Sequence, residues 1–520
     1  MRDRLGAMAA VNERSRQRAA EVTAIALPAS VMAVMATWSA VRIPLWRDEV
    51  ATQSFAVLDG GDRAAALSHV DAVFRLYYWL EHLAIIGIPS PLGLRLASVI
   101  AAVGTVVIAG LLARKWWGTL ASLVTGFVLT LNPFAVQMAA TARPYALACF
   151  FVALAAFAMD RATRAERSLA WWLAYAVSIG LAGGMHLFSL LSIVPLAFLL
   201  LGASRRRVLS WLLSTVLAVA ALAPIAVVAY GQRGQVSWIP RPDVRRALGA
   251  LGSAIVNRGD SLFKLPEAVA LGLSVVALGV GLVVLLRQPR SQARTLTIAR
   301  YGFAVGLFVV PWALLLVYSL LATPYLRTAY LLPAVLGLAL GFGFCADAFR
   351  RFKVGRDSWI RYAFGAALWL LLIVPVTIGA ATTFDLLRAN WWVDDFPGIA
   401  HLAAERVEPG DLLAIVQTPS ETGVAAGFAN QSGDGDLQRT TRQRLLTGNQ
   451  PLVDLREVVS VRPFVTTRAS RTADGTMWMV FTRGDRDIAK SRLADDGHTC
   501  SVTGDDVQFG LLRLARFECR

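Results

Sequence analysis

Charged side chains are scarce in this chain of 520 residues: Asp, Glu, Lys and Arg make up 17% of it, and hydrophobic residues make up 56%. Such a composition excludes an ordinary soluble enzyme. Apolar runs of roughly 20 residues, the length that a helix needs to cross a bilayer, recur along the first three quarters of the chain. The sequence therefore predicts a polytopic α-helical membrane protein.

Acidic residues are the scarcer of the two signs, with 35 Asp and Glu against 51 Lys and Arg and a formal net charge of +16. This excess does not indicate nucleic-acid binding, because the basic residues cluster between apolar runs, as the positive-inside rule requires. A cleavage site of convincing form is also lacking after the arginine-rich segment Met1–Glu21. We therefore expect an uncleaved, cytoplasmic N-terminus.

Cysteine is rare as well, with four in the chain and no CxxC or histidine spacing typical of zinc. Cys149 and Cys345 lie in apolar runs, where we expect core packing. Cys500 and Cys519 lie near the C-terminus, and a disulfide between them is an open alternative if that region is outside the cytoplasm.

The apolar runs predict about eleven spans. They cover Val22–Val41 and about residues 93–113, 117–137, 146–160, 169–185, 187–203, 208–229, 267–286, 301–321, 328–347 and 361–382. The segment Val73–Ile88 is also apolar, but it is short and contains Arg75, Glu81 and His82. If it is a juxtamembrane helix, every basic loop falls on the side of the N-terminus; if it is a span, those loops move outside. We therefore predict a juxtamembrane helix and a C-terminus outside the cytoplasm.

The tail differs from the rest because it is polar. We expect a transmembrane module over residues 1–384 and a soluble extracytoplasmic domain over residues 385–520. A helix over Phe396–Val407, followed by strands, predicts a small α/β domain. Ser432–Arg444 is the expected mobile loop. The predicted strands are Leu412–Val416, Met477–Phe481 and Phe509–Leu514.

The segment Pro44–His82, directly after the first predicted span, holds the densest set of acids before residue 385. Asp59 and Asp62 are interpreted as solvated loop residues. The pair Asp48-Glu49 is interpreted as functional, because a loop just outside a membrane has little structural need for adjacent carboxylates, whereas chemistry at that surface needs one. The predicted topology also places the stretches 138–145, 230–266 and 322–327 on the same outer face as this segment.

Three motifs on that face together resemble those of a known protein family. They are Asp48-Glu49 in the first outer loop, Ala142-Arg143-Pro144-Tyr145 at a span end, and the late turn Pro324–Pro333 with its arginine and aromatic residues. In this order the sequence resembles the GT-C superfamily of polyprenyl-phosphate-sugar-dependent glycosyltransferases. The resemblance is to the branch that holds protein O-mannosyltransferases, bacterial mannosyltransferases and lipid A aminoarabinose transferase. It runs from the first span to the start of the tail.

The resemblance implies roles for residues. Asp48, with Glu49 beside it, is implied as the base that takes a proton from an acceptor hydroxyl. Arg327 is the candidate cation for the leaving lipid phosphate, whose charge grows as its bond breaks. Basic residues of the stretch 230–266 would attract the phosphate of the donor or anionic headgroups. The further candidate substrate-binding residues are His69, Asp71, Tyr77, Tyr78, Arg143, Tyr145, His186, Arg241, Arg245, Arg258, Lys264, Tyr325 and Tyr330.

Structural alternatives stand beside these roles. Asp48 has the alternative of pairing with Arg47 or capping the loop helix. His69 and Asp71 are either surface residues or residues that orient the acceptor. Arg143 has the alternative of snorkelling to the interface, and His186 that of a satisfied turn histidine.

A metal site is a further alternative, since Asp48, Glu49, His69 and Asp71 are ligand types for divalent ions. The resemblance implies no essential metal, and we expect no cofactor.

The resemblance thus implies an inverting transferase in the plasma membrane. It would move a sugar, mannose first, from a polyprenyl phosphate to an extracytoplasmic glycolipid, glycan or protein acceptor. An arabinosyltransferase is the rival within this class, and a lipid or polysaccharide transporter is the rival from another class. A transporter would place charged groups inside the bundle near the midplane. The predicted spans are nearly free of acids, which favours the enzyme.

Overall fold

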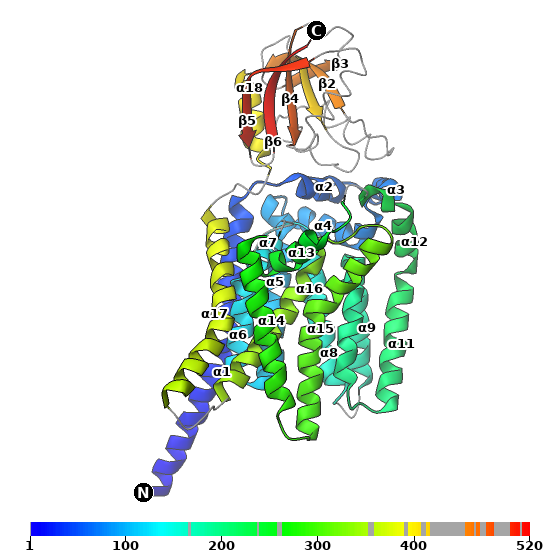
Figure 1. The fold of residues 1–520 in the computed structure, drawn as a ribbon. Helices are drawn as coiled ribbons and strands as arrows, with labels where there is room; N and C mark the ends of the chain where they lie inside the picture. The colour runs from blue at the N-terminus through cyan, green and yellow to red at the C-terminus, as the bar shows by residue number, and fades with distance from the viewer. Residues whose placement is uncertain are drawn as a thin grey trace. The chain divides into compact units, whose positions relative to one another are not determined.

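Figure 1 shows the computed structural model of the chain, which describes residues 2–164, 168–236, 239–256, 263–351, 358–388, 394–406, 412–416, 453–461, 464–468, 475–482, 500–509 and 512–519. The chain divides into two compact units. The bundle unit comprises Met1–Ser39, Ala97–Val227 and Ile239–Leu387. The loop-and-sheet unit comprises Ala40–Leu96, Val228–Trp238 and Arg388–Arg520.

Long apolar helices build the bundle unit (Figure 1). Among the described residues, seven helices are long and apolar enough to cross a membrane, which confirms the prediction of a polytopic membrane protein. They are α1 (Arg2–Arg42), α5 (Pro91–Trp117), α8 (Tyr145–Ala162), α14 (Leu265–Leu286), α15 (Gln292–Leu321), α16 (Leu332–Arg351, preceded by the 3₁₀ turn η5, Thr328–Leu331) and α17 (Ser358–Arg388).

Two of the remaining predicted spans are bent. Helices α6 (Thr119–Thr130) and α7 (Pro133–Ala139) meet at 68°, and α11 (Arg205–Ala221) and α12 (Ala223–Gly231) meet at 48°. At the first bend, Pro133 disfavours helical backbone at Asn132, whose side chain instead caps α7 by accepting from the Ala135 N–H. If each bent pair is one span, the described helices give up to nine spans.

The last two predicted spans are short. One is α9 (Leu169–Met185), and the other is a run of short 3₁₀ and α turns, namely η2 (Leu187–Ser192), α10 (Ile193–Leu196) and η3 (Ala197–Leu200). The predicted number of about eleven spans is therefore not confirmed.

Helix α16 is the centre of the bundle, because 89% of its apolar 18-residue segment is buried. It packs against α6, α14 and α15. Glycine makes this close approach feasible, because a Cβ on Gly337 would lie 2.6 Å from the carbonyl oxygen of Ala304 and 2.6 Å from the Phe308 nitrogen. A Cβ on Gly343 would likewise meet the Ala121 oxygen of α6 at 2.7 Å.

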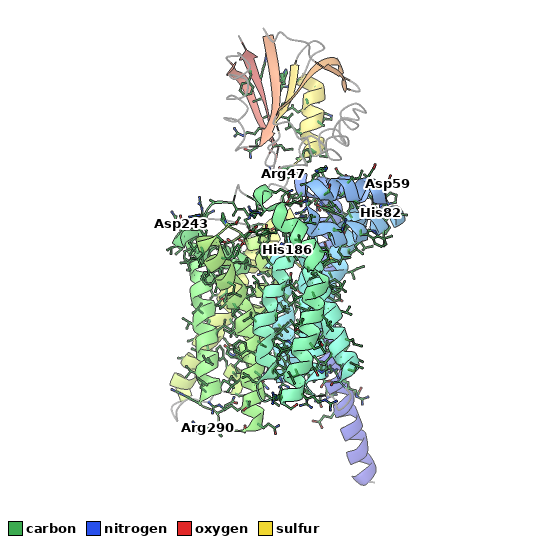
Figure 2. All side chains as sticks on the ribbon, turned by 90° about the vertical axis from the view of Figure 1, so that its right-hand side faces the viewer. Arg47, Asp59, His82, His186, Asp243 and Arg290 are labelled. Carbon is green, nitrogen blue, oxygen red and sulfur yellow. The ribbon has the colours of Figure 1, made fainter. Side chains whose placement is uncertain are left out.

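The bundle unit has two ends that differ in composition. Figure 2 shows Arg290 at one end, and His186 and Asp243 toward the other. The short helix α13 (Val244–Val256) lies at the end with Asp243 and packs against α7 and η5 (Figure 1). His186 and Asp243 therefore lie toward the opposite end of the bundle unit from Arg290.

In the loop-and-sheet unit, the first loop folds into α2 (Arg47–Ala56), α3 (Gly60–His69), the 3₁₀ turn η1 (Ala72–Phe74) and α4 (Arg75–Gly87). The predicted juxtamembrane helix is present as η1 and α4. Helix α4 is not among the described helices that could cross a membrane. The unit also contains the short turn η4 (Arg233–Val236).

The tail forms a six-stranded sheet in the order β3-β2-β1-β4-β6-β5. Strands β1 and β4 are parallel and the other pairs are antiparallel, with α18 (Phe396–Arg406) packed on β5 and β6. The small C-terminal α/β fold is therefore confirmed. The strands are β1 (Leu412–Val416), β2 (Val453–Val461), β3 (Phe464–Arg468), β4 (Gly475–Thr482), β5 (Cys500–Phe509) and β6 (Leu512–Cys519).

One predicted strand is wrong. The apolar run 509–514 is not a single strand, because Phe509 ends β5 and Leu512 begins the antiparallel β6. Cys500 and Cys519 are backbone partners in this hairpin, a register in which a disulfide has a suitable Cα separation. The segment expected to be mobile, residues 432–444, lies outside the described residues.

Candidate active site

Glu49 anchors the first turn of α2. Arg95, at the start of α5, donates from Nε to Glu49 Oε1 at 2.7 Å and from Nη2 to Oε2 at 2.5 Å. Its remaining N–H groups bond the carbonyl oxygens of Ala40, Ile43 and Pro44. All five guanidinium donors are thus used, and both side chains are 1% exposed. This clamp, Glu49 with Arg95, ties the end of α1 and the start of α5 to α2.

Asp48 lies beside this clamp in the same helical turn, and its side chain is half-buried. The N-cap of α2 is Trp46, whose N–H donates to Glu49 Oε2 at 3.3 Å, so Asp48 does not cap the helix. A carboxylate in a first helical turn is favoured by the helix dipole. Asp48 therefore lies on a backbone that the neighbouring clamp holds in place.

Arg47 connects α2 to the start of the tail. Its backbone nitrogen and its Nε both donate to Asp394 Oδ2, at 3.1 Å each. Asp394 is fully buried, and burial raises the pKa of its carboxyl, against the opposing effect of the Arg47 charge and with a smaller contribution from Asp48. The charge of Asp48 therefore adds to the raised pKa of Asp394.

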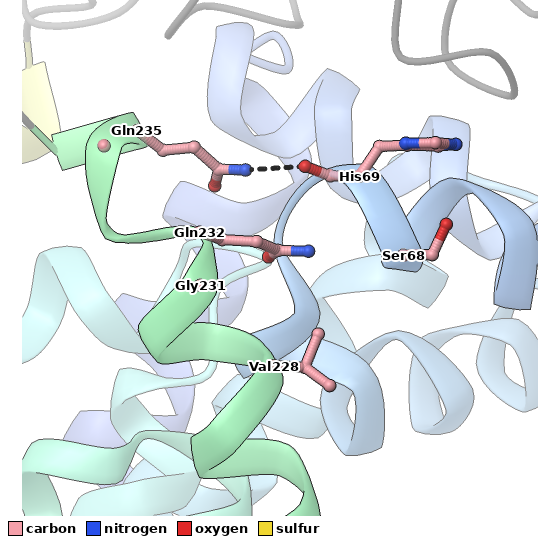
Figure 3. Close-up of a pocket in the computed structure, with 7 residues that line it drawn as sticks. Ser68, His69, Val228, Gly231, Gln232 and Gln235 are labelled. Carbon is pink, nitrogen blue, oxygen red and sulfur yellow. Dashed lines mark hydrogen bonds between the residues drawn. The ribbon is translucent and has the colours of Figure 1, made fainter.

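His69 and Asp71 lie in a turn that is held from two sides. Asp71 has φ 57°, the left-handed region, and its Oδ2 accepts from the hydroxyl of Tyr78 at 2.8 Å. Gln235 donates to the His69 oxygen at 3.1 Å (Figure 3) and accepts from the Asp71 N–H. Gln232 donates to the Leu67 oxygen and accepts from the Ala72 N–H. The two glutamines thus order this turn.

A shallow pocket lies beside the turn. It has a volume of about 450 Å³ and is lined by Ser68, His69, Val228, Gly231, Gln232, Gly234 and Gln235. The His69 ring points away from Gln235 and is exposed (Figure 3). The arrangement offers hydroxyl, imidazole and amide groups to a polar ligand.

Tyr77 and Tyr78 are fully buried. The Tyr78 ring stacks on Phe55 with centroids 4.5 Å apart. Glu81, one turn further on, is also fully buried. Burial raises its pKa to about 8, the charge of Glu49 adds to the rise, and the Tyr77 hydroxyl opposes it. Glu81 is therefore a neutral carboxyl at neutral pH.

In the bundle unit, the structure brings four candidate residues into one aromatic cluster. The ring centroid of His186 lies 5.3 Å from that of Tyr145 and 4.6 Å from that of Tyr330. Phe188 links this group to Tyr325, at 5.1 Å. Three segments that are far apart in the sequence therefore converge here.

His186 is 5% exposed, at the break between α9 and η2. Burial lowers its pKa to about 3, and the nearby Arg143 charge lowers it further. The imidazole is therefore neutral. Arg143 is itself buried, so it does not snorkel to solvent. Arg327 is half-buried at the start of η5.

The other basic candidates are peripheral. Arg241, Arg245 and Lys264 are exposed, and Arg258 lies outside the described residues. Among the residues that the structure describes, no group of three or more His, Cys, Asp and Glu side chains could hold a metal ion. In the suggested set of Asp48, Glu49, His69 and Asp71, the Glu49 oxygens are already bonded to Arg95.

Sequence reasoning missed four residues that order the site. Arg95 gave a signal, because a lone arginine near the start of an apolar span needs an acidic partner. Asp394, Gln232 and Gln235 gave none, since nothing in their local sequence indicates which segment they bond.

Comparison with known proteins supports the fold. The family model of dolichyl-phosphate-mannose-protein mannosyltransferase matches residues 76–230. Sequence comparison with curated proteins gives no match. The crystal structure of ArnT from Cupriavidus metallidurans bound to undecaprenyl phosphate is similar, with a TM-score of 0.51, 14% identity, and coverage of 95% of this chain and 97% of that chain.

The apo structure of the same ArnT gives a TM-score of 0.52 at 14% identity, with the same coverage of both chains. The cryo-EM structure of the arabinofuranosyltransferase AftD from Mycobacteria gives 0.48 at 14% identity, over 94% of this chain and 39% of that chain. The two ArnT matches confirm the resemblance seen in the sequence, and the chain has the fold of the GT-C superfamily.

Proposed function

We propose that the chain is a membrane glycosyltransferase that moves a sugar from a polyprenyl-phosphate donor to an extracytoplasmic acceptor, with mannose as the first candidate sugar. The fold supports the class of enzyme. The matching family model, with its mannosyl donor, favours mannose. The match to an ArnT structure that holds undecaprenyl phosphate favours a donor of that chemical class.

The observation that carries the mechanism is the position of Asp48, on a helical turn clamped by Glu49 and Arg95. Asp48 accepts the proton of the acceptor hydroxyl as that oxygen attacks C1 of the sugar. The bond from C1 to the phosphate oxygen breaks, and its electron pair stays on the lipid phosphate. Attack from the opposite face inverts the anomeric centre. Glu49 acts in this scheme as a positioning residue, because its oxygens are bonded to Arg95.

A fixed cation would stabilise the charge that grows on the leaving phosphate, and we assign that role to Arg327. Arg327→Lys keeps the charge but loses the planar fork, so activity should fall most at low donor concentration. Full turnover by the lysine variant under those conditions would leave Arg327 as an interfacial anchor.

Residues 1–384 are proposed as the catalytic module and residues 385–520 as a soluble domain outside the cytoplasm of a plasma-membrane protein. A reporter that is active only in the cytoplasm, fused after Arg520, should be silent. Activity of that reporter would overturn the orientation and with it the extracytoplasmic acceptor.

The test of the mechanism is sugar transfer by purified variants from a synthetic polyprenyl-phosphate mannose in nanodiscs. Asp48→Asn is nearly isosteric and should lower the rate by about 10²–10⁴-fold, since general-base removal has effects of that size. Asp62→Asn, the same exchange in the first turn of α3, is the matched control and should be near normal. Near-normal transfer by Asp48→Asn would refute the assignment, and a collapse in Glu49→Gln alone would move the role to Glu49.

A further inference from the structure

A second carboxylate with several partners lies in the bundle unit, at the end of the helices where the arginine-rich turns lie. Asp160, in the last turn of α8, is 2% exposed. Its Oδ2 accepts from Lys115 Nζ at 2.6 Å, and its Oδ1 accepts from Trp116 Nε1 at 2.8 Å. Arg164 also pairs with Oδ1. Both oxygens of Asp160 are therefore occupied by these donors.

Arg300, on α15, is the third cation of the group, but its Nε does not form a hydrogen bond with Asp160. The residue is 9% exposed, and its Nε lies 4.0 Å from Asp160 Oδ1, too far for a hydrogen bond. Among the described residues this buried Nε has no hydrogen-bond partner. Its guanidinium carbon lies 5.7 Å from the ring centre of Trp116. Among the described residues, Arg300 is thus a buried cation whose nearby carboxylate, Asp160, is shared with two other cations.

The charges of this group do not balance. Lys115, Arg164 and Arg300 surround a single carboxylate. Residues 165–167, which include Glu166 and Arg167, lie outside the described residues, so this imbalance applies to the described side chains. The positive-inside rule explains basic residues in solvated loops, but it does not explain a cation that is removed from water. A buried charge with incomplete compensation is unfavourable, so a further anion would stabilise this group.

We propose that Lys115, Arg164 and Arg300 form a binding site for a phosphate group, and that the phosphodiester of an anionic lipid headgroup fills it. Guanidinium groups recognise phosphate oxygens with two parallel hydrogen bonds. Lys115 and Arg164 are 30% and 35% exposed at their side chains, which leaves a way in for a headgroup. The site lies where apolar helices end, and basic pockets between membrane helices are suited to anionic headgroups.

The experiment compares thermal unfolding and lipid binding of the full chain with phosphatidylglycerol, with phosphatidylcholine and with inorganic phosphate. Phosphatidylglycerol should raise the Tm of the wild type more than phosphatidylcholine does. Arg300→Gln should bind phosphatidylglycerol about tenfold more weakly, as expected from the loss of a charge-assisted hydrogen bond. In lipid-free detergent the same variant should be at least as stable as the wild type, because it removes a buried charge that Asp160 compensates only from 4.0 Å.

Arg290→Gln is the matched control, since it removes one arginine at the same end of the bundle (Figure 2). It should keep the phosphatidylglycerol response. Equal losses in both variants, or an equal response to phosphatidylcholine, would overturn the proposal. If inorganic phosphate alone gives the full Arg300-dependent response, the site holds but free phosphate is its ligand. If Arg300→Gln cannot be purified, Arg300→Met takes its place, and an undiminished lipid response in that variant would likewise refute the site.

Discussion

Two buried carboxylates, Glu49 and Asp160, organise different regions of the molecule in opposite ways. Glu49 pairs with one arginine, Arg95. Every N–H donor of Arg95 bonds either Glu49 or a backbone carbonyl oxygen. Asp160 meets three cations, and one of them, Arg300, keeps a buried donor without a partner among the described residues. In the first region, positive and negative charges are equal in number and every guanidinium donor has an acceptor. In the second region, cations and hydrogen-bond donors outnumber the acceptors among the described residues.

The difference indicates what each region is for. A balanced pair has no capacity for a ligand, so its effect is to fix the backbone beside it, here the turn that carries Asp48. A group with surplus donors remains open to an anion. The same residue types thus give a rigid support in one place and a candidate binding site in another.

The largest expected effect comes from breaking the balanced pair. Arg95→Met leaves Glu49 buried without a cation and should lower the free energy of unfolding by about 3–5 kcal/mol, measured by chemical denaturation in detergent. Arg42→Met, at the exposed end of α1, is the control and should have little effect. Adding Glu49→Leu to Arg95→Met should recover part of the loss, because no charge then stays buried. No recovery would mean that the carbonyl contacts, rather than the ion pair, dominate the clamp.

A third carboxyl, Glu81, sharpens the comparison because burial and Glu49 raise its pKa to about 8. Its pKa in the unfolded chain is near 4.5, so the unfolded state loses the proton first as the pH rises. Stability should be highest below about pH 4.5 and should fall by at most about 1.4 kcal/mol per pH unit up to about pH 8. Glu81→Gln, which mimics the neutral acid, should remove this slope. The exposed Glu405→Gln should leave the slope unchanged, and a wild-type slope that survives in Glu81→Gln would assign it to another group.

The smallest effect is expected at the unbalanced group. Asp160→Asn removes the carboxylate from beside three cations, two of which are partly exposed, so we expect a loss of about 1–2 kcal/mol. Phosphatidylglycerol should compensate for this loss, whereas it should not rescue Arg95→Met. Asp347→Asn is the control, because Asp347 pairs with the exposed Arg350 and Arg351. If phosphatidylglycerol restored the stability of both Arg95→Met and Asp160→Asn, or of neither variant, the distinction between the two regions would be lost.

Sequence reasoning recovered the features that depend on local pattern. The apolar runs identified the long helices, and charge bias separated α4 from the spans. Helix α18 and strands β1 and β4 were also predicted from their apolar residues. The hairpin at Phe509 and Leu512 was not, because apolar residues on both sides of a turn look like one strand.

Some members of the candidate site could be named from the sequence. His186, Tyr145, Tyr325 and Tyr330 were each singled out, and the structure brings them together. What could not be predicted is which partner each polar group selects. The bond between Arg47 and Asp394 joins residues 347 positions apart. The left-handed backbone at Asp71 likewise depends on Tyr78 and the two glutamines rather than on a local turn signal.

The order in which the ribosome delivers the contacts of α2 has a consequence for assembly. Every partner of Arg95 lies 46 to 55 residues upstream of it, so each has already been synthesised when α5 emerges. The clamp can therefore close on a nascent chain that has only its first hairpin in the membrane. The second contact of this turn, from Arg47 to Asp394, must wait for almost the whole bundle to be inserted. In a chain truncated before residue 394, α2 should consequently keep the contact between Glu49 and Arg95 but lack the contact between Arg47 and Asp394.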